Sequence, residues 1–478
     1  MPAWHADSSR QIVERIIIEA DLELVSVTSF AGLSDDGTDI PLLVEGGEAI
    51  LLGTSLAGAL RTYLREREHG YGEEETVDGW AATLFGAKKG DDKGLQSALI
   101  CNDAYASQAS SSYRDGVAIE GGSGTAADKA LFNISVWDIG TSFSLRFELV
   151  ITKEQNGSFI KKLLASCLTA LQQGDIRLGG RKNRGYGEVR VKGWQVKEYK
   201  VASQLIDLLA FLEEGGETLS EPLQTNLFTC LGVENDLADS RAYLAIDGCF
   251  ALEHSLLMHS ADSPQQMDKT HIHSRVLGAD AVPIFTGTGS GGALRQRLDA
   301  ILSTFRYSPN LPGSSALFGS TDVHESRLRI DETFIQNASV DVVQQRIKID
   351  RFSGGVIQQA LFDALPVFAQ QDTLIYLRVH LKFYKTSAYV HETALLLLLL
   401  KDVWLADLPF GGEKQIGRGR LRGVRAHLSL NHSSEGRDLR WWHLEAEEHG
   451  KLKVTSSHED VDPREQLETF VEALGQAA

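Results

Sequence analysis

The segment GTSLAGALR at residues 53–61 returns as GTGSGGALR at residues 287–295 (287 − 53 = 234). Four further landmarks recur in the same order at nearly the same offset: LFG at 84 and 317, an arginine at 114 and 346, ALF at 130 and 360, and GGRKNRGYGEV at 179 against GGEKQIGRGRL at 411. A shared order of landmarks indicates duplication, and this period is far too long for a solenoid repeat. The sequence therefore predicts two tandem domains of similar fold.

The composition is that of an ordinary globular protein, with 42% hydrophobic and 23% charged residues, which excludes collagen-like and disordered classes. Four widely spaced cysteines (101, 167, 230 and 249) form no metal-binding or disulfide pattern, so we expect buried thiols and a cytoplasmic location. The N-terminus lacks a signal-peptide pattern. The longest apolar run, ALLLLLL at 394–400, is much shorter than a membrane span of roughly 20 residues and predicts a buried helix, so we expect no membrane partner.

The net charge of −18 repels polyanions at long range, so any nucleic-acid contact must come from local basic segments. RLGGRKNRGYGEVRVK at 177–192 is such a segment, with a single acidic residue. A solvated basic face is the simpler interpretation of the same pattern.

Each copy shows the same order of patterns: alternating strand, polar loop, helix, a hairpin-like excursion, second helix, glycine-rich loop and strand. This order predicts an α+β protein with two tandem ferredoxin-like (RRM-like) domains that carry inserted hairpin arms. The expected boundaries are 1–199 for the first domain, 200–240 for a partly helical linker, 241–429 for the second domain and 430–478 for an acidic C-terminal tail.

Three motifs taken together resemble the repeat-associated mysterious protein (RAMP) superfamily, and more narrowly the backbone subunits of type III CRISPR effector complexes. They are a helix-opening G-x-S-L-x-G-x-L-R, a central R-x-G-V-A-I followed by A-L-F and G-T-x-F, and a late G-G-x-x-x-x-G-Y-G. The second copy departs in three places: GTGSGG lacks the Ser-Leu pair, the counterpart of residues 121–124 is shorter, and Gly-Arg-Gly replaces Gly-Tyr-Gly. Two such domains in one chain resemble the double-backbone subunit of type III-D variants.

The resemblance implies a subunit that binds the CRISPR guide RNA, contacts other effector subunits and cuts complementary target RNA with an aspartate in the loop before the first helix. Asp39, in DIPLL, fits the family pattern better than Asp35 or Asp36; in the second copy Asp268 is the choice and Asp262 its rival. The 2′-hydroxyl of RNA is the nucleophile, so a carboxylate that positions the nucleotide, moves a proton or holds a divalent metal such as Mg²⁺ is sufficient. The expected products are a 2′,3′-cyclic phosphate and a 5′-hydroxyl.

The glycines and cations of the shared motifs are predicted RNA contacts. They are Gly53, Ser55, Arg61, Gly287 and Arg295 at the helix openings, Arg114, Lys129, Arg346, Lys348 and Arg351 in the arms, and Arg181, Lys182, Arg184, Lys414, Arg418 and Arg420 in the late loops. A structural salt bridge is the alternative role for Arg61 and Arg295.

Other functions remain open. One or both copies could be a non-catalytic scaffold that only holds guide RNA and neighbouring subunits, and an isolated RNA-binding protein is a third possibility. Gly287, Gly289 and Gly292 match G-x-G-x-x-G, but no repeated βαβ order surrounds them, which disfavours a nicotinamide enzyme. His271 and His273 beside Asp268 are possible metal ligands, although paired histidines in a polar loop are usually not.

Overall fold

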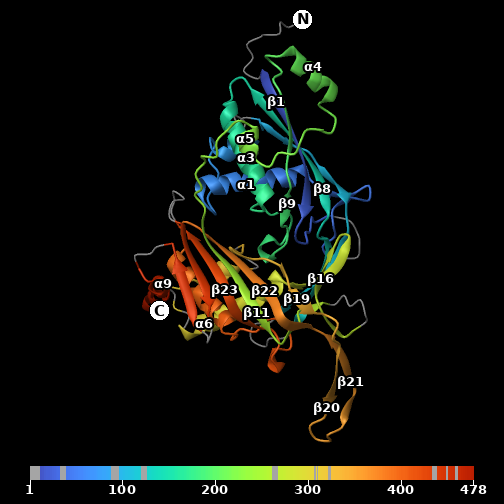
Figure 1. The fold of residues 1–478 in the computed structure, drawn as a ribbon, viewed down its shortest axis with the longest axis vertical. Coiled ribbons are helices and arrows are strands. Elements are labelled where there is room, and N and C mark those ends of the chain that lie inside the picture. The colour runs from blue at the N-terminus through green and yellow to red at the C-terminus, as the bar shows by residue number, and fades with distance from the viewer. Residues whose placement is uncertain are drawn as a thin grey trace.

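The computed structural model describes residues 11–32, 39–87, 96–119, 126–260, 267–305, 308, 311–320, 325–432, 439–447, 451–457 and 461–477. These residues form two mixed α+β domains that lie one above the other along the long axis of the molecule (Figure 1). The mixed α+β class predicted from the sequence is confirmed.

The first domain has an antiparallel sheet in which strands follow the order β9-β1-β8-β4. One long helix follows β3 and a second follows β8, so that in the sequence they precede and follow the hairpin arm of this domain. The elements are β1 (Ile12–Leu24), β2 (Val44–Glu45), β3 (Glu48–Leu51), α1 (Gly53–His69), α2 (Trp80–Phe85), β4 (Leu99–Cys101), β5 (Ala104–Gln108), β8 (Ser142–Thr152), α3 (Gly157–Gln173), the 3₁₀ turn η1 (Lys182–Arg184), β9 (Val189–Val191) and β10 (Gln195–Tyr199).

The second domain repeats this order as β23-β11-β22-β17. Its elements are β11 (Ala242–Glu253), β12 (Ser255–Leu256), β13 (His259–Ser260), β14 (Lys269–His271), β15 (His273–Val276), β16 (Ala279–Phe285), α6 (Gly287–Thr304), α7 (Ser314–Phe318), β17 (Leu328–Ile330), β18 (Thr333–Phe334), β19 (Gln336–Ser339), β22 (Val367–Phe383), α8 (Tyr389–Trp404), the 3₁₀ turn η2 (Lys414–Ile416) and β23 (Arg420–Asn431). The two halves therefore share their strand order as well as their motifs.

The hydrophobic periods of the sequence explain the core of each domain. Leu56, Leu60 and Leu64 follow one another at four-residue spacing on α1 and are fully buried, as an amphipathic helix requires. The apolar run at 394–400 lies within α8, where its leucines join the second core, so the predicted buried helix is confirmed. No helix in the described part of the chain is long and apolar enough to cross a membrane.

Each domain also carries a two-stranded hairpin arm. The first arm is β6 (Ser111–Ile119) with β7 (Ala126–Trp137), and the second is β20 (Gln344–Ile349) with β21 (Val356–Leu365). The second arm projects from the end of the molecule that is far from the first domain (Figure 1). The first arm instead contacts the second domain near its root, as described below.

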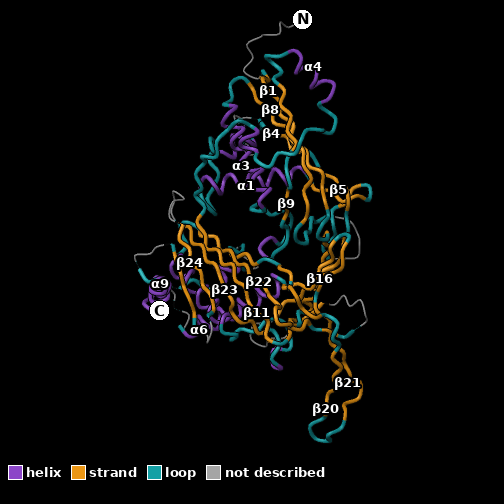
Figure 2. The backbone as a smooth tube through the Cα atoms, in the orientation of Figure 1, coloured by secondary structure: helices purple, strands orange, loops and turns teal. Residues whose placement is uncertain are grey.

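The two segments predicted as linker and tail are integrated into the domains. The linker forms α4 (Leu205–Glu214) and α5 (Leu227–Cys230), which pack on Ile17 and Tyr199 and on the first core, respectively. The segment 430–478 adds β24 (Leu439–Ala446) and β25 (Leu452–Ser456) to the edge of the second sheet beyond β23, as Figure 2 shows for β24, and ends in α9 (Pro463–Ala477). Trp442 and Leu474 are buried in the second core, which is why this acidic segment folds.

One expectation was wrong: Cys230 is an exposed thiol, whereas Cys167 and Cys249 are buried.

Polar groups join the domains. Arg177 of the first domain donates to Asp331 of the second across 3.1 Å, and both side chains are less than a tenth exposed. Asn183 Nδ2 donates to the carbonyl of Ser326 at 2.7 Å. The duplicated units therefore contact each other through unlike surfaces, the glycine-rich loop of one and the β17 region of the other.

Candidate nucleic-acid interface

Asp39 lies at the root of the first arm. Its backbone N–H donates to Asn133 Oδ1 and its own Oδ2 accepts from the Asn133 N–H, both at 2.9 Å. The next residue, Ile40, forms a parallel bridge with Ile134 of β7. This reciprocal pair fixes the backbone and one carboxylate oxygen of an exposed aspartate, and no hydrogen bond among the described residues uses Oδ1.

Asp268 occupies the matching position in the second domain. Its Oδ2 accepts from the Asp363 N–H at 3.0 Å, and Lys269 pairs in parallel with Ala364 of β21. Asn133 and Asp363 are the residues that follow the two ALF motifs, so each aspartate binds the same backbone position of its own arm. The sequence contained this signal in the repeated ALF motif, but the partners Asn133 and Asp363 were not predicted. Asp35, Asp36 and Asp262 lie outside the described residues.

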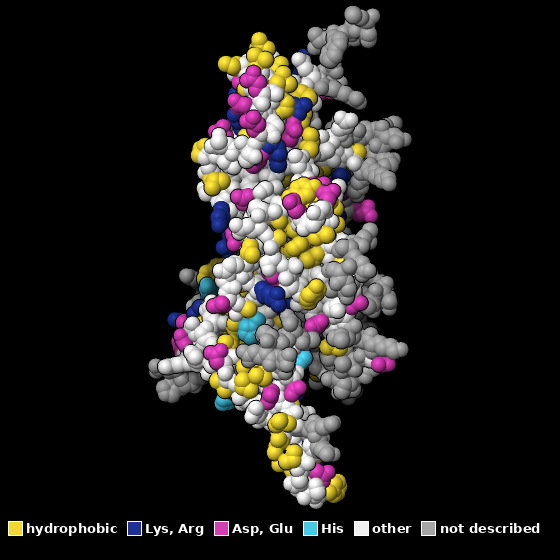
Figure 3. Space-filling view, turned by 90° about the vertical axis from the view of Figure 1, so that its right-hand side faces the viewer, with side chains coloured by type: hydrophobic (Ala, Val, Ile, Leu, Met, Phe, Trp, Pro, Cys, Tyr) yellow, Lys and Arg dark blue, Asp and Glu magenta, His cyan; other side chains and the backbone are white. Residues whose placement is uncertain are grey.

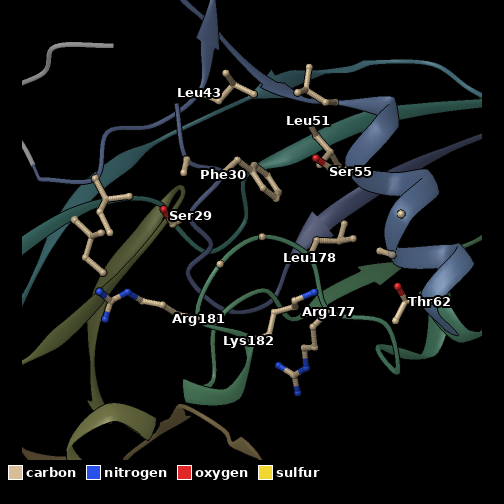
Figure 4. Close-up of a pocket in the computed structure, with 18 residues that line it drawn as sticks. Ser29, Phe30, Leu43, Leu51, Ser55, Thr62, Arg177, Leu178, Arg181 and Lys182 are labelled. Carbon is tan, nitrogen blue, oxygen red and sulfur yellow. The ribbon is translucent and has the colours of Figure 1, made fainter. Parts of the chain in front are cut away.

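A pocket of about 530 Å³ separates α1 from the first glycine-rich loop, residues 179–187. Figure 4 shows Ser55 and Thr62 of α1 on one side and Arg181 and Lys182 of the loop on the other. Ile40, the neighbour of Asp39, also lines the pocket. Of the predicted RNA contacts, the structure therefore brings Ser55, Arg181 and Lys182 together beside the predicted catalytic loop.

The loop backbone sets the direction of its cations. Arg181 has the left-handed conformation (φ 54°), and its guanidinium lies over the Phe132 ring with the carbon 4.6 Å from the centroid, a cation–π contact. Burial, together with the nearby charge of Arg184, lowers the pKa of Arg181, although an arginine remains charged at neutral pH. Lys182 and Arg184 are exposed on the 3₁₀ turn. The first loop thus presents two cationic side chains to solvent, while Asn183 between them binds the second domain.

The second glycine-rich loop, residues 411–419, has a negatively charged residue at the position where the first loop has a positively charged one. Glu413 replaces Arg181 with the same left-handed backbone (φ 56°) and accepts from Lys269 at 2.9 Å, Arg346 at 3.0 Å and Arg418 at 2.9 Å. Burial opposes ionisation of Glu413, but the hydrogen bonds from Lys269 and Arg418 outweigh it and hold its pKa below the ordinary value. Lys269 takes over the aromatic contact, with Nζ 5.0 Å from the Phe362 centroid.

Several predicted phosphate contacts are occupied by internal partners. Arg418 is 2% exposed and also donates to Ser255 Oγ at 3.0 Å. Arg61 makes two hydrogen bonds to the Glu75 carboxylate and one to the Gly86 carbonyl, which is the structural role considered for it above. Arg114, 5% exposed, donates to the His273 carbonyl at 3.1 Å and to Ser274 Oγ at 3.0 Å in the second domain. These arginines stabilise the fold. The partners of Arg114 lie about 160 positions away in the second domain, which the sequence could not reveal.

The two helix-opening glycines serve close packing. A Cβ on Gly53 would collide with the carbonyl of Cys101, and one on Gly287 would collide with the carbonyls of Ile330 and Arg184. Gly287 thus lies where the first loop reaches the second domain.

The remaining predicted contacts differ in exposure: Lys348, Arg351 and Arg420 are exposed, Arg295 and Lys414 are half-buried, and the side chain of Lys129 lies outside the described residues.

The histidines considered as metal ligands have structural roles. His271 is buried; its Nδ1 accepts from the Met258 N–H at 3.1 Å and its Nε2 lies 2.9 Å from the Ile284 carbonyl. Burial lowers the pKa of His271 to about 3, so it stays neutral. His273 Nδ1 lies 2.8 Å from the His271 carbonyl. In the described part of the chain, no three or more His, Cys, Asp or Glu residues are grouped so that they could hold a metal.

Comparison with protein-family models gives one result for both halves of the chain. The model of the RAMP superfamily matches residues 37–190 and again residues 268–422, which together make up more than half of the sequence. Both matches include the predicted aspartate, the arm and the glycine-rich loop of their domain. A comparison with curated proteins found no match.

Proposed function

Because the chain belongs to the RAMP superfamily, a CRISPR-associated family, we propose that it is a guide-RNA-binding backbone subunit of a type III CRISPR effector complex. The double family match supports a tandem, type III-D-like fusion of two backbone domains. The strand orders β9-β1-β8-β4 and β23-β11-β22-β17 support a ferredoxin-like core in each domain. The partners in this proposal are guide RNA, complementary target RNA and other effector subunits.

The catalytic part of the proposal rests on one observation, the matched placement of Asp39 and Asp268 at the roots of the two arms. Two loops of unrelated sequence present a carboxylate to the same backbone position of a duplicated hairpin. A turn-forming aspartate has no need of such a partner. We propose that each domain cuts the target RNA that is paired to the guide.

Cleavage of RNA requires positioning and proton transfer. The 2′-oxygen attacks the adjacent phosphorus while the bond to the 5′-oxygen breaks, which leaves a 2′,3′-cyclic phosphate and a 5′-hydroxyl. The proton leaves the 2′-hydroxyl for a base, and the departing 5′-oxygen gains a proton from solvent. Asp39, held through Oδ2 by Asn133, directs its second oxygen away from that contact and can orient the nucleotide or accept the proton.

The donor set suits magnesium bound mainly by the RNA. Mg²⁺ keeps several waters and is commonly held by one or two carboxylates together with substrate phosphates. Asp39 and Asp268 each offer one such carboxylate beside the arm. When bound, the ion would stabilise negative charge developing on the phosphate.

The second arm has the surface expected of an element that inserts among nucleotides. Phe352 at its tip is fully exposed, and Ile347, Ile349, Val356 and Leu361 are each at least half exposed along its strands. Figure 3 shows hydrophobic side chains along this projection. Exposed apolar and aromatic groups on a hairpin can stack against bases without reading their sequence.

A second candidate function is favoured for the second domain alone. Glu413 forms ion pairs with Lys269, Arg346 and Arg418, whereas the first loop keeps its cations exposed or stacked on an aromatic ring. Cations that are paired with an internal carboxylate are less available to phosphates, which supports a scaffold role for the second domain and cutting by the first.

The experiment is target-RNA cleavage by the assembled complex with guide and Mg²⁺. Asp39→Asn and Asp268→Asn retain an acceptor for the arm backbone but remove the charge, and each should abolish one cut at a fixed position. Asp280→Asn, on an exposed strand residue, is the matched control. Normal cutting by both variants refutes the catalytic assignment, and loss of a cut with Asp39→Asn only makes the second domain a scaffold.

A further inference from the structure

The outer face of the second sheet carries a histidine pair that has no part in the proposed RNA site. His427 of β23 and His443 of β24 are direct cross-strand partners. Their neighbours Leu428 and Trp442 are buried in the second core, so the two imidazoles lie on the opposite, outward face. The ring centroids are 4.3 Å apart and the two Nδ1 atoms 3.3 Å apart.

This nitrogen separation matches the bite of a tetrahedral metal. Zinc binds imidazole nitrogen at about 2.0–2.1 Å, so two such ligands at a tetrahedral angle lie roughly 3.3–3.4 Å apart. We propose that His427 and His443 bind one divalent transition metal, of the zinc, nickel or copper class, through their Nδ1 atoms. Imidazole suits these metals, whereas Mg²⁺ prefers oxygen ligands, so this site is chemically distinct from the one proposed for RNA cleavage.

The surroundings of His427 favour the ligating form. Its Nε2 lies 2.9 Å from Ser429 Oγ, and a proton on Nε2 that is donated to this hydroxyl leaves Nδ1 unprotonated. Ligating histidines typically use their second nitrogen in this way, which fixes both tautomer and ring orientation.

The charge and openness of the face are also suitable. Asp247 of β11 is the cross-strand partner of His427 on the side away from His443, and its exposed carboxylate attracts a cation, although Arg378 lies 3.9 Å from it. His443 is exposed and His427 partly so, which gives a metal access from solvent. Since the described residues offer no group of three ligands, water completes the coordination.

The position of the pair gives the metal a structural role. β24, β25 and α9 follow residue 422, where the second family match ends, so they are an addition to the shared domain. β24 joins the sheet by pairing with β23. A metal bound by both His427 and His443 would link β23 to β24. It would stabilise the added C-terminal segment, because a ligand that binds only the folded state opposes unfolding.

The test is calorimetric titration of the full-length, untagged chain with ZnCl₂. We expect one zinc per chain, an affinity loss of roughly tenfold or more in His427→Gln and in His443→Asn, and about tenfold in Ser429→Ala, which keeps both imidazoles. Zinc should raise the thermal unfolding midpoint of the wild type but not of the two histidine variants. His254→Asn is the matched control: His254 is exposed and has a left-handed backbone that asparagine tolerates.

The outcomes separate clearly. Circular dichroism first establishes that each variant is folded. Zinc binding that persists unchanged in folded His427→Gln or His443→Asn overturns the proposal. Absence of zinc binding in the wild type also overturns it, and then the two rings share only a hydrogen bond.

Discussion

Exchange of charge in the two glycine-rich loops should change how RNA binding responds to salt. Glu413→Gln keeps the shape and an acceptor at the centre of the second loop but removes its negative charge. Of its three cationic partners, Arg418 is 2% exposed and cannot reach RNA, whereas the side chains of Lys269 and Arg346 are 39% and 27% exposed. Two cations thus become available for phosphates.

The magnitude follows from counterion release. Each phosphate contact contributes about 0.7 to the slope of log K against log salt for single-stranded nucleic acid, so two contacts steepen the slope by about 1.4, or roughly a sevenfold larger affinity loss between 50 and 200 mM salt. The reverse change in the first loop, Arg181→Gln, removes one cation and should reduce the slope by about 0.7.

The assay is fluorescence anisotropy of labelled guide RNA bound by the full chain at several salt concentrations. Glu413→Gln should also cost stability, about 2 kcal/mol for weakened charged hydrogen bonds, so a thermal scan accompanies each titration. An unchanged slope for Glu413→Gln, with the variant folded, refutes the reasoning that Glu413 keeps Lys269 and Arg346 from binding phosphates. An unchanged slope for Arg181→Gln refutes the assignment of the first loop to RNA.

Three further predictions concern stability. Leu60→Ala, at a fully buried position of α1, should lower the free energy of unfolding by about 2–5 kcal/mol in denaturant titrations, whereas Ser55→Ala on the exposed side of the same helix should change it little. Arg177→Met removes one of two cations from the buried Asp331 carboxylate, which keeps Arg329 at 3.2 Å, and should cost about 2 kcal/mol by the same measurement; the added change Asp331→Leu should recover part of the loss. Burial, a hydrogen bond to Glu198 and the negative charge of Glu198 raise the pKa of Glu14 from 4.5 to about 7 despite Lys161, so the folded protein retains a proton that the unfolded chain has lost. The stability that Glu14 contributes should therefore fall as pH rises from 4.5 to 7. Glu14→Gln should flatten that part of a plot of the thermal unfolding midpoint against pH.

The parts of the structure that the sequence predicted are those with a local or repeated signal. Tandem domains, the buried helix at 394–400 and the shared helix opening at Gly53 and Gly287 each depend on spacing within one segment or on its recurrence in the second copy. The contacts of Arg114 and Arg177 join residues more than 150 positions apart, and an arginine with a buried partner has the same local sequence as one that faces solvent. Interfaces between duplicated units therefore lie beyond motif analysis.

The C-terminal segment shows a different reason for a missed prediction. Its composition was the basis for the expected acidic tail, but alternation places Trp442 and Leu444 on one face of β24, where they join the second core, while His443 points outward. Composition describes the average over the segment, and burial depends only on the inward-facing half of a strand. The alternation of buried and outward-facing residues in WWHLE, residues 441–445, therefore indicates a packed strand, whereas the net charge of the segment does not.

One difference between the two copies lies at one aromatic ring in each domain. The phenylalanine of the ALF motif holds a cation in both, but the cation comes from the loop in the first domain, as Arg181, and from the strand after Asp268 in the second, as Lys269. Once the strand supplies the cation, a loop arginine would repel it, and Glu413 at that position binds it instead. The same substitution then draws Arg346 away from solvent, so one exchange of charge both preserves the aromatic contact and reduces the cationic surface. The duplicated fold keeps its aspartates in register, while the second domain holds Lys269, Arg346 and Arg418 in ion pairs with Glu413. This difference in charge is the physical basis for expecting unequal roles from two domains of the same architecture.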